Sequence, residues 1–204
     1  MQILTGTLLL LLVLGGFTLF SYKAPHGMKA MGALAGAACA SFLVEAFHSS
    51  FFGNVLNIEF LKKVGDANGS LGGVAAAILV PLALGVSPVY SVLIGLSCSG
   101  LGILPGFIAG YLMSFVVKFL EEKLPSGLDL IVIIVVATPL TRIIGDFTAP
   151  VVDSTLLKIG QVLIASANSN PITMGIILGG IITVVATAPL SSMALTAMLG
   201  LTGA

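Results

Sequence analysis

Three ionisable residues in one apolar segment could carry chemistry. Arg142, Asp146 and Asp153 are four and seven residues apart, which puts them on one face of a helix that continues past Pro150. Charged side chains are costly in a bilayer, and those found there contact a substrate, an ion or one another. We therefore take all three as candidate substrate or gate contacts. In the alternative, Arg142 and Asp146 only neutralise each other and Asp153 lies at a helix end.

Polar residues elsewhere extend this candidate set. Glu45 and His48 are three residues apart, and a carboxylate beside an imidazole could bind a sugar hydroxyl or relay a proton. Both could instead lie at the membrane surface and touch lipid headgroups. Asn68 is a further candidate, although asparagine before Gly69 and Ser70 is typical of a turn or helix cap.

Hydroxyl groups near helix breaks are the remaining candidates. Thr138 precedes Pro139, and Thr187 lies in a second Pro-containing break at 186–192. Their hydroxyls could bind substrate or only bond to backbone carbonyls that the prolines leave free. The breaks at 97–106 and 186–192 could form half-helix tips whose free backbone groups meet a polar substrate. Alternatively, Gly102, Gly106 and Gly110 are ordinary close-packing positions.

Motifs of soluble enzymes are missing from the sequence. The two His, two Cys and scattered carboxylates have no metal-binding spacing, and there is no phosphate-binding loop, nucleophile elbow or dinucleotide fingerprint. Cys39 and Cys98 lie in apolar stretches, so we expect no disulfide between them. We expect no catalytic residue, no metal and no cofactor.

The elements that position these residues must be membrane helices. Of 204 residues 57% are apolar and 8% charged, about a third of the charge that a soluble domain carries. Disorder needs fewer apolar residues, and nucleic-acid binding needs surplus Lys and Arg. Residues 67–117 and 159–204 hold no charged side chain, and each stretch could hold two crossings. We predict an all-α polytopic membrane protein with six or seven transmembrane helices, some of them broken or re-entrant.

Apolar runs set the expected elements within a single permease domain, 1–204. Crossings are expected at 3–21, 28–47, 71–88, 89–119, 128–168 and from 172 onward, with 89–119 forming two short helices or a re-entrant hairpin. Residues 50–66 alternate aromatic and charged residues at helical spacing, which predicts an interfacial amphipathic helix. Small residues at Gly32, Gly36 and Ala40 favour close packing within the chain over a dimer face.

Several segments together resemble a known family. They are 15–21 (GGFTLFS), 23–48 (KAPHGMKAMGALAGAACASFLVEAFH), 68–90 (NGSLGGVAAAILVPLALGVSPVY), 100–112 (GLGILPGFIAGYL) and 175–203 (GIILGGIITVVATAPLSSMALTAMLGLTG). The sequence resembles the sugar-permease IIC subunits of the bacterial phosphotransferase system, in the group of perfringolysin regulator-type membrane proteins. Members of this group are longer, so we expect the chain to be the N-terminal portion of the family unit. The Gly-Ile-Thr-Glu substrate motif of better-known IIC families is missing, and no Trp is available for sugar stacking.

The resemblance implies a multi-pass protein of the bacterial inner membrane. It implies a homodimer that binds and translocates a carbohydrate at mid-membrane, with a cytoplasmic IIB phosphocarrier as partner. The alternatives are a membrane sensor or regulator that binds a solute without moving it, and an ion-coupled carrier or channel. In the carrier, Asp146 or Asp153 would be the ion site.

Overall fold

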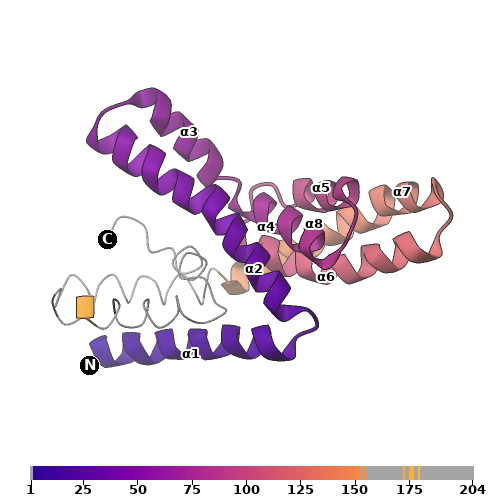
Figure 1. Ribbon diagram of the computed structural model, residues 1–204, viewed down its shortest axis with the longest axis horizontal. Coiled ribbons are helices and arrows are strands. Elements are labelled where there is room, and N and C mark those ends of the chain that lie inside the picture. The colour runs from indigo at the N-terminus through magenta and orange to yellow at the C-terminus, as the bar shows by residue number, and fades with distance from the viewer. Residues whose placement is uncertain (1, 153, 155–171, 173–174, 177–178, 180–204) are drawn as a thin grey trace.

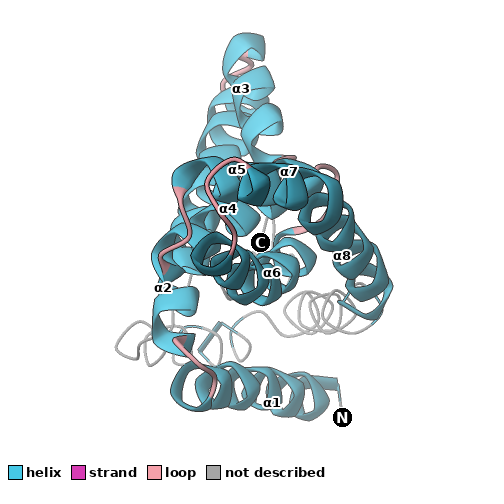
Figure 2. Ribbon diagram, turned by 90° about the vertical axis from the view of Figure 1, so that its right-hand side faces the viewer, coloured by secondary structure: helices cyan, strands magenta, loops and turns pink. Residues whose placement is uncertain are grey.

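The computed structural model describes residues 2–152, 154, 172, 175–176 and 179, and this part of the chain is helices joined by short linkers, with no strand. The long helices pack beside one another (Figures 1 and 2). In chain order the elements are α1 Gln2–Lys23, α2 Gly27–Ala38, the π-helical segments η1 Cys39–Leu43 and η2 Ala46–Val55, α3 Glu59–Gly69, α4 Gly72–Leu84, α5 Pro88–Ser97, α6 Ile103–Lys123, α7 Leu128–Val132, the π-helical segment η3 Ile133–Ala137 and α8 Thr138–Val152.

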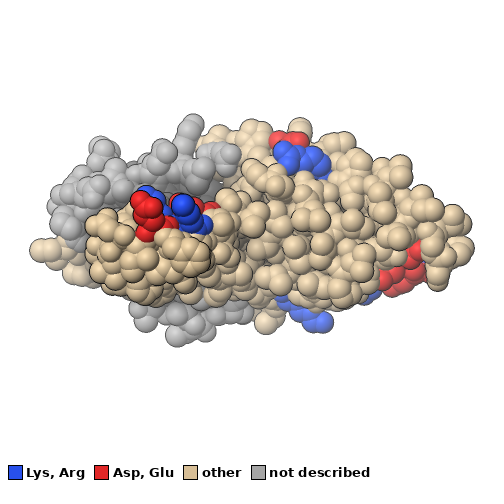
Figure 3. All heavy atoms as spheres, turned by 90° about the horizontal axis from the view of Figure 1, so that it is seen from above, with Lys and Arg blue, Asp and Glu red and all other residues tan. Residues whose placement is uncertain are grey.

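Among the described residues, three helices are long and apolar enough to cross a bilayer: Gly27–Val55, Ile103–Lys123 and Leu128–Val152. A fourth crossing is formed if α3 and α4, which meet at a bend of 52°, are counted together. Leu11–Lys23 and Pro88–Ser97 are shorter apolar helices. Charged side chains form small isolated groups on an otherwise uncharged face (Figure 3). The all-α polytopic prediction is confirmed, while the crossings expected after residue 152 lie outside the described residues.

The apolar run 89–119 is divided into two helices. α5 has 10 residues, or about 15 Å of helix, which is half the thickness of the hydrocarbon core. It ends before the 98–102 linker, where Gly100 has a φ of 77°, a left-handed conformation that glycine adopts without strain. α6 then begins at Ile103. This segment is therefore one 10-residue helix followed by a 21-residue helix that is long enough to cross a bilayer.

Glycines set the packing of α4 against α6. A Cβ at Gly106 would lie 2.2 Å from the Gly73 carbonyl oxygen, and one at Gly110 would lie 2.8 Å from Ala77 Cα. Because both partners advance by four residues, α4 and α6 run parallel with their N-termini together. Gly106 and Gly110 are therefore close-packing positions, as the alternative interpretation predicted, whereas Gly102 has only Pro105 Cδ nearby, at 3.7 Å.

The segment 50–66, predicted as one amphipathic helix, is divided in the structure. The helix from Gly27 ends at Val55, and α3 turns back alongside it from Glu59, so that the two form a hairpin projecting from the other helices (Figures 1 and 2). Asn57 at the tip has a φ of 55°, which asparagine tolerates. Ser49 Oγ donates a hydrogen bond of 2.5 Å to Asp66 Oδ1 across the hairpin. An interfacial location for this segment stays a prediction.

The small-residue face of the Gly27–Val55 helix does not pack against the other described residues as predicted. Gly32, Gly36 and Ala40 are exposed, and no atom of the described residues lies within 4 Å of a Cβ placed at Gly32. Larger side chains one or two positions away, such as Met31 and Leu34, are buried instead, because they fill the core shared with α4 and α6.

Candidate functional site

A cavity of about 370 Å³ lies where the helix breaks meet. It is formed by the long Gly27–Val55 helix, the α3–α4 bend and the linker from α5 to α6. Its volume is within the range of small-molecule sites in proteins. The lining residues are Ser41, Phe42, Glu45, Gly69, Ser70, Gly72, Gly73, Gly100, Leu101, Gly102 and Ile103.

Glu45 is the one ionisable side chain among these lining residues. It is half-buried, and a Cβ at Gly69 would lie 2.2 Å from Glu45 Oε2 and 2.3 Å from its Cδ. Gly69 therefore provides the space that the carboxylate occupies. The hydroxyl of Ser41 donates to the Ala37 carbonyl oxygen at 2.8 Å, and that of Ser70 to the Ala67 carbonyl oxygen at 2.9 Å.

Two helix N-termini open on the same cavity. α4 begins at Gly72 and α6 at Ile103, and residues at both starts line the cavity. The first turn of a helix has N–H groups without partners inside the helix, and the aligned peptide dipoles make this end positive. The cavity thus combines one carboxylate with backbone donors, a combination that suits a ligand with both hydroxyl donors and hydroxyl acceptors.

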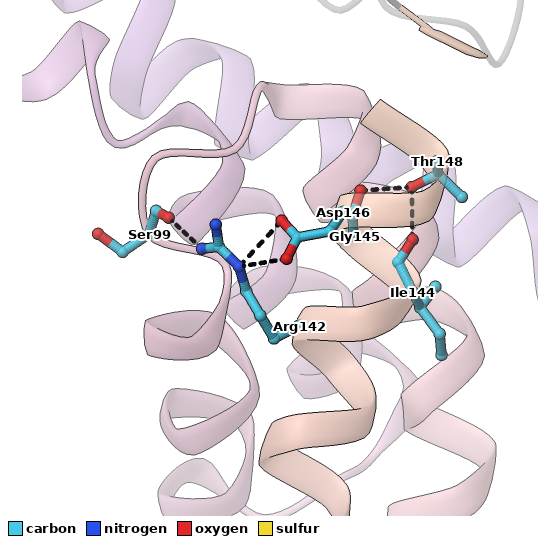
Figure 4. A network of polar contacts seen from close by, with 6 residues as sticks. All are labelled: Ser99, Arg142, Ile144, Gly145, Asp146 and Thr148. Atoms are coloured by element: carbon cyan, nitrogen blue, oxygen red, sulfur yellow. Dashed lines mark hydrogen bonds and ion pairs between the residues drawn. The ribbon is translucent and has the colours of Figure 1, made fainter. Parts of the chain in front are cut away.

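Arg142 and Asp146 form an ion pair on α8, outside the cavity lining. Arg142 Nε lies 3.0 Å from Asp146, and Arg142 Nη1 donates to the Ser99 carbonyl oxygen at 2.6 Å (Figure 4). The two side chains are 45% and 54% exposed. The pair that the alternative interpretation expected is therefore present, and Arg142 also holds the linker beside the cavity. Substrate contact by these two residues stays a prediction.

The other predicted polar residues have local partners. Thr138 donates to the Ile134 carbonyl oxygen. Thr148, which is not one of the predicted residues, likewise donates to the Ile144 carbonyl oxygen at 2.9 Å (Figure 4). His48 Nδ1 lies 3.1 Å from the Val44 carbonyl oxygen. The Thr138 hydroxyl thus donates its hydrogen bond to a backbone carbonyl within its own helix. That Thr138 and His48 contact substrate stays a prediction.

Asn68 does not cap a helix. α3 continues through Gly69, and Asn68 Nδ2 donates to the Val64 carbonyl oxygen at 2.8 Å, so the cap alternative is wrong. The turn alternative is confirmed, because Leu71 N–H donates to the Asn68 carbonyl oxygen at 3.1 Å. The N-cap of α4 is Leu71. Asp153 and Thr187 lie outside the described residues.

Several lining residues were missed from the sequence, notably Ser41, Phe42, Gly72 and Gly73. The signal that could have found the last two is the glycine cluster 69–73, which interrupts apolar sequence as the cluster 100–106 does. Two such breaks in helices that lie side by side place free backbone groups together.

The phosphotransferase system EIIC family matches residues 28–204, which is most of the chain. The chain belongs to this EIIC family. As an EIIC protein it is a membrane-embedded, IIC-like component of sugar transport, and the family implies a sugar substrate and a IIB partner. No curated protein and no solved structure matches the chain. Within the described part of this EIIC chain, no group of three His, Cys, Asp or Glu side chains could hold a metal ion.

Proposed function

We propose that this EIIC protein binds its sugar in the cavity at Glu45 and translocates it from there. The observation that carries the proposal is the convergence of two helix breaks, the α3–α4 bend and the α5–α6 linker, on one cavity that holds a carboxylate from the Gly27–Val55 helix. Irregular backbone at membrane depth persists where it is buried in protein or lines a cavity. Transport proteins use such broken helices to bind substrate near mid-membrane.

The chemistry of the lining fits a carbohydrate. The Glu45 carboxylate accepts hydrogen bonds from two hydroxyls of a sugar ring, and N–H groups at the starts of α4 and α6 donate to other hydroxyl oxygens. The ring of Phe42 supplies an apolar wall for the C–H face of the sugar. Hydrogen bonds to a charged group contribute about 1.5–3 kcal/mol each, so Glu45 supplies a large share of the affinity.

A single fluorophore tests where the sugar binds. The chain has no Trp, so Phe42→Trp places the one indole in the cavity wall. Purified protein in nanodiscs is titrated with a panel of neutral hexoses and disaccharides. We expect saturable quenching by one or more sugars, and an affinity at least about tenfold weaker when Glu45→Gln is added.

Glu59→Gln is the matched control, because Glu59 lies on the hairpin and does not line this cavity. It should leave the titration unchanged. Equal affinities for the Glu45→Gln and parent proteins would refute the proposed site.

Vesicle uptake separates transport from the other functions. We propose that tritiated sugar enters as its phosphate when purified IIA, IIB and a phosphoryl donor are supplied. Uptake that follows a proton or sodium gradient without a donor would favour an ion-coupled carrier, and binding without uptake would favour a sensor. Chemical cross-linking in the same vesicles tests the homodimer that the family resemblance implies.

A further inference from the structure

The 98–102 linker is held by α8, a helix that does not itself line the cavity. Arg142 Nη1 donates to the Ser99 carbonyl oxygen at 2.6 Å, and Ser99 directly precedes Gly100, a lining residue. Arg142 Nε is at the same time 3.0 Å from Asp146. The planar guanidinium reaches both partners at once because its donors point in different directions.

A second contact from α8 meets the same linker. A Cβ at Gly145 would lie 2.2 Å from Leu101 Cδ1, so the Leu101 side chain fills the space beside that glycine. Leu101 is buried and lines the cavity. Two residues of the linker, Ser99 and Leu101, are therefore fixed by positions 142 and 145, which lie on one face of α8.

The backbone hydrogen bonds of the linker lie mainly at its two ends: Cys98 N–H donates to the Gly95 carbonyl oxygen at 2.9 Å, Ser99 N–H donates to that of Leu96 at 3.2 Å, and the Gly102 carbonyl oxygen accepts from Gly106 N–H at 3.1 Å. Leu101 N–H donates to the Cys98 carbonyl oxygen at 3.1 Å, while Gly100 takes the left-handed φ of 77°. Glycine adopts many backbone conformations, so a segment with Gly100 and Gly102 needs outside contacts to hold one shape. Arg142 supplies one such contact, a charged hydrogen bond to the Ser99 carbonyl oxygen.

We propose that Arg142 is a positioning residue, oriented by Asp146, that fixes the 98–102 linker as one wall of the sugar cavity. Its effect on sugar affinity rests on the proposed function, whereas its effect on the linker does not. Loss of the guanidinium frees the linker and weakens sugar binding without removing a group that touches the sugar.

Cys98 is a built-in reporter for the linker. It is fully buried, directly precedes Ser99, and is one of two cysteines in the chain. In a Cys39→Ser background, the rate of Cys98 labelling by N-ethylmaleimide measures how often the linker opens. We expect Arg142→Gln to raise this rate about tenfold and to weaken affinity for the sugar selected by the fluorescence screen to a similar extent. Arg142→Lys should give an intermediate rate of Cys98 labelling, because lysine keeps the positive charge but lacks the planar guanidinium that reaches Ser99 and Asp146 at once.

Exchanging the two charges separates positioning from simple neutralisation. Arg142→Asp combined with Asp146→Arg keeps an ion pair but moves the guanidinium one helical turn away from Ser99. If Arg142 positions the linker, Cys98 in this double variant is labelled as fast as in the Arg142→Gln protein. Normal labelling and affinity in the double variant would overturn the proposal.

The remaining controls distinguish a general loss of folding from the two proposed roles, sugar binding by Glu45 and linker positioning by Arg142. Lys63→Gln removes an exposed charge on the hairpin and should label like the parent, and variants are compared only when size-exclusion profiles match. Glu45→Gln should weaken sugar binding without faster Cys98 labelling. If Cys98 in the Arg142→Gln protein is labelled at the same rate as in the parent protein, the positioning role is overturned, even if Glu45→Gln weakens sugar binding. If Arg142→Gln speeds Cys98 labelling but leaves sugar affinity unchanged, Arg142 positions the linker without affecting sugar binding, and that part of the proposal is overturned.

Discussion

At the scale of single residues, Gly69 decides where the Glu45 carboxylate can lie. A methyl group at position 69 would come within 2.2 Å of Glu45 Oε2, and only the end of a flexible side chain need move to relieve that contact. Gly69→Ala should therefore change stability little but displace the carboxylate. We expect about tenfold weaker sugar binding in the Phe42→Trp titration.

Gly32→Ala is the control for this change. It adds the same methyl group to a helix at an exposed position with no described neighbour within 4 Å. Parental affinity in the Gly69→Ala protein would show that the carboxylate does not set the binding of the sugar.

At the scale of helices, the α4–α6 pair depends on backbone contact. A Cβ at Gly106 would meet the carbonyl oxygen and Cα of Gly73, at 2.2 and 2.6 Å, and neither atom belongs to a side chain that could rotate away. Gly106→Ala should force the two helices apart and lower the free energy of unfolding by about 1–3 kcal/mol. Denaturation in SDS, followed by circular dichroism, measures this loss.

Gly102→Ala provides the comparison for the helix pair. Its Cβ would lie 3.7 Å from Pro105 Cδ, an ordinary contact, and its backbone is extended with a φ of −64°. Its unfolding should match that of the parent. If Gly106→Ala also matched the parent, the close approach of α4 to α6 would not be a source of stability.

At the scale of the whole molecule, packing brings two of three lysine pairs to one end, namely Lys23 with Lys29 and Lys118 with Lys123. The hydroxyl of Tyr111 donates to the Pro25 carbonyl oxygen at 2.8 Å, and His26 lines a small hollow with Leu84 and Lys118. The turn after α1 therefore lies with the end of α4 and the last part of α6. Lys62 and Lys63 lie on the hairpin at the far end of the 29-residue helix (Figure 1).

This arrangement predicts the orientation in the membrane. Lys23, Lys29, Lys118 and Lys123 share one end, against two lysines on the hairpin, so the positive-inside rule puts the shared end in the cytoplasm. In a background without cysteine, Ser126→Cys should react with an impermeant maleimide only in inside-out vesicles. Asn57→Cys should react only in right-side-out vesicles, and the reverse pattern would contradict the orientation.

The all-α membrane fold could be predicted from the sequence because composition and apolar run length require it. Segments free of charge are long enough for helices, and lipid leaves backbone polar groups no other partner. The break in 89–119 was also predictable, since Gly100 and Gly102 interrupt helix locally and Pro105 is tolerated only in the first turn of the helix that follows. The pair Arg142 and Asp146 followed from a spacing of four residues.

The tertiary structure alone decided which of these features form a site. Glu45 lies more than 50 residues from the linker beside its cavity, and Arg142 is 43 residues from Ser99. Helical periodicity specifies neighbours three and four positions away, whereas contacts over such separations depend on which helix faces pack and in which direction the helices run. Parallel packing of α4 and α6 brought two helix starts to Glu45, and the contact of Tyr111 on α6 with Pro25 in the turn after α1 placed four lysines at one end.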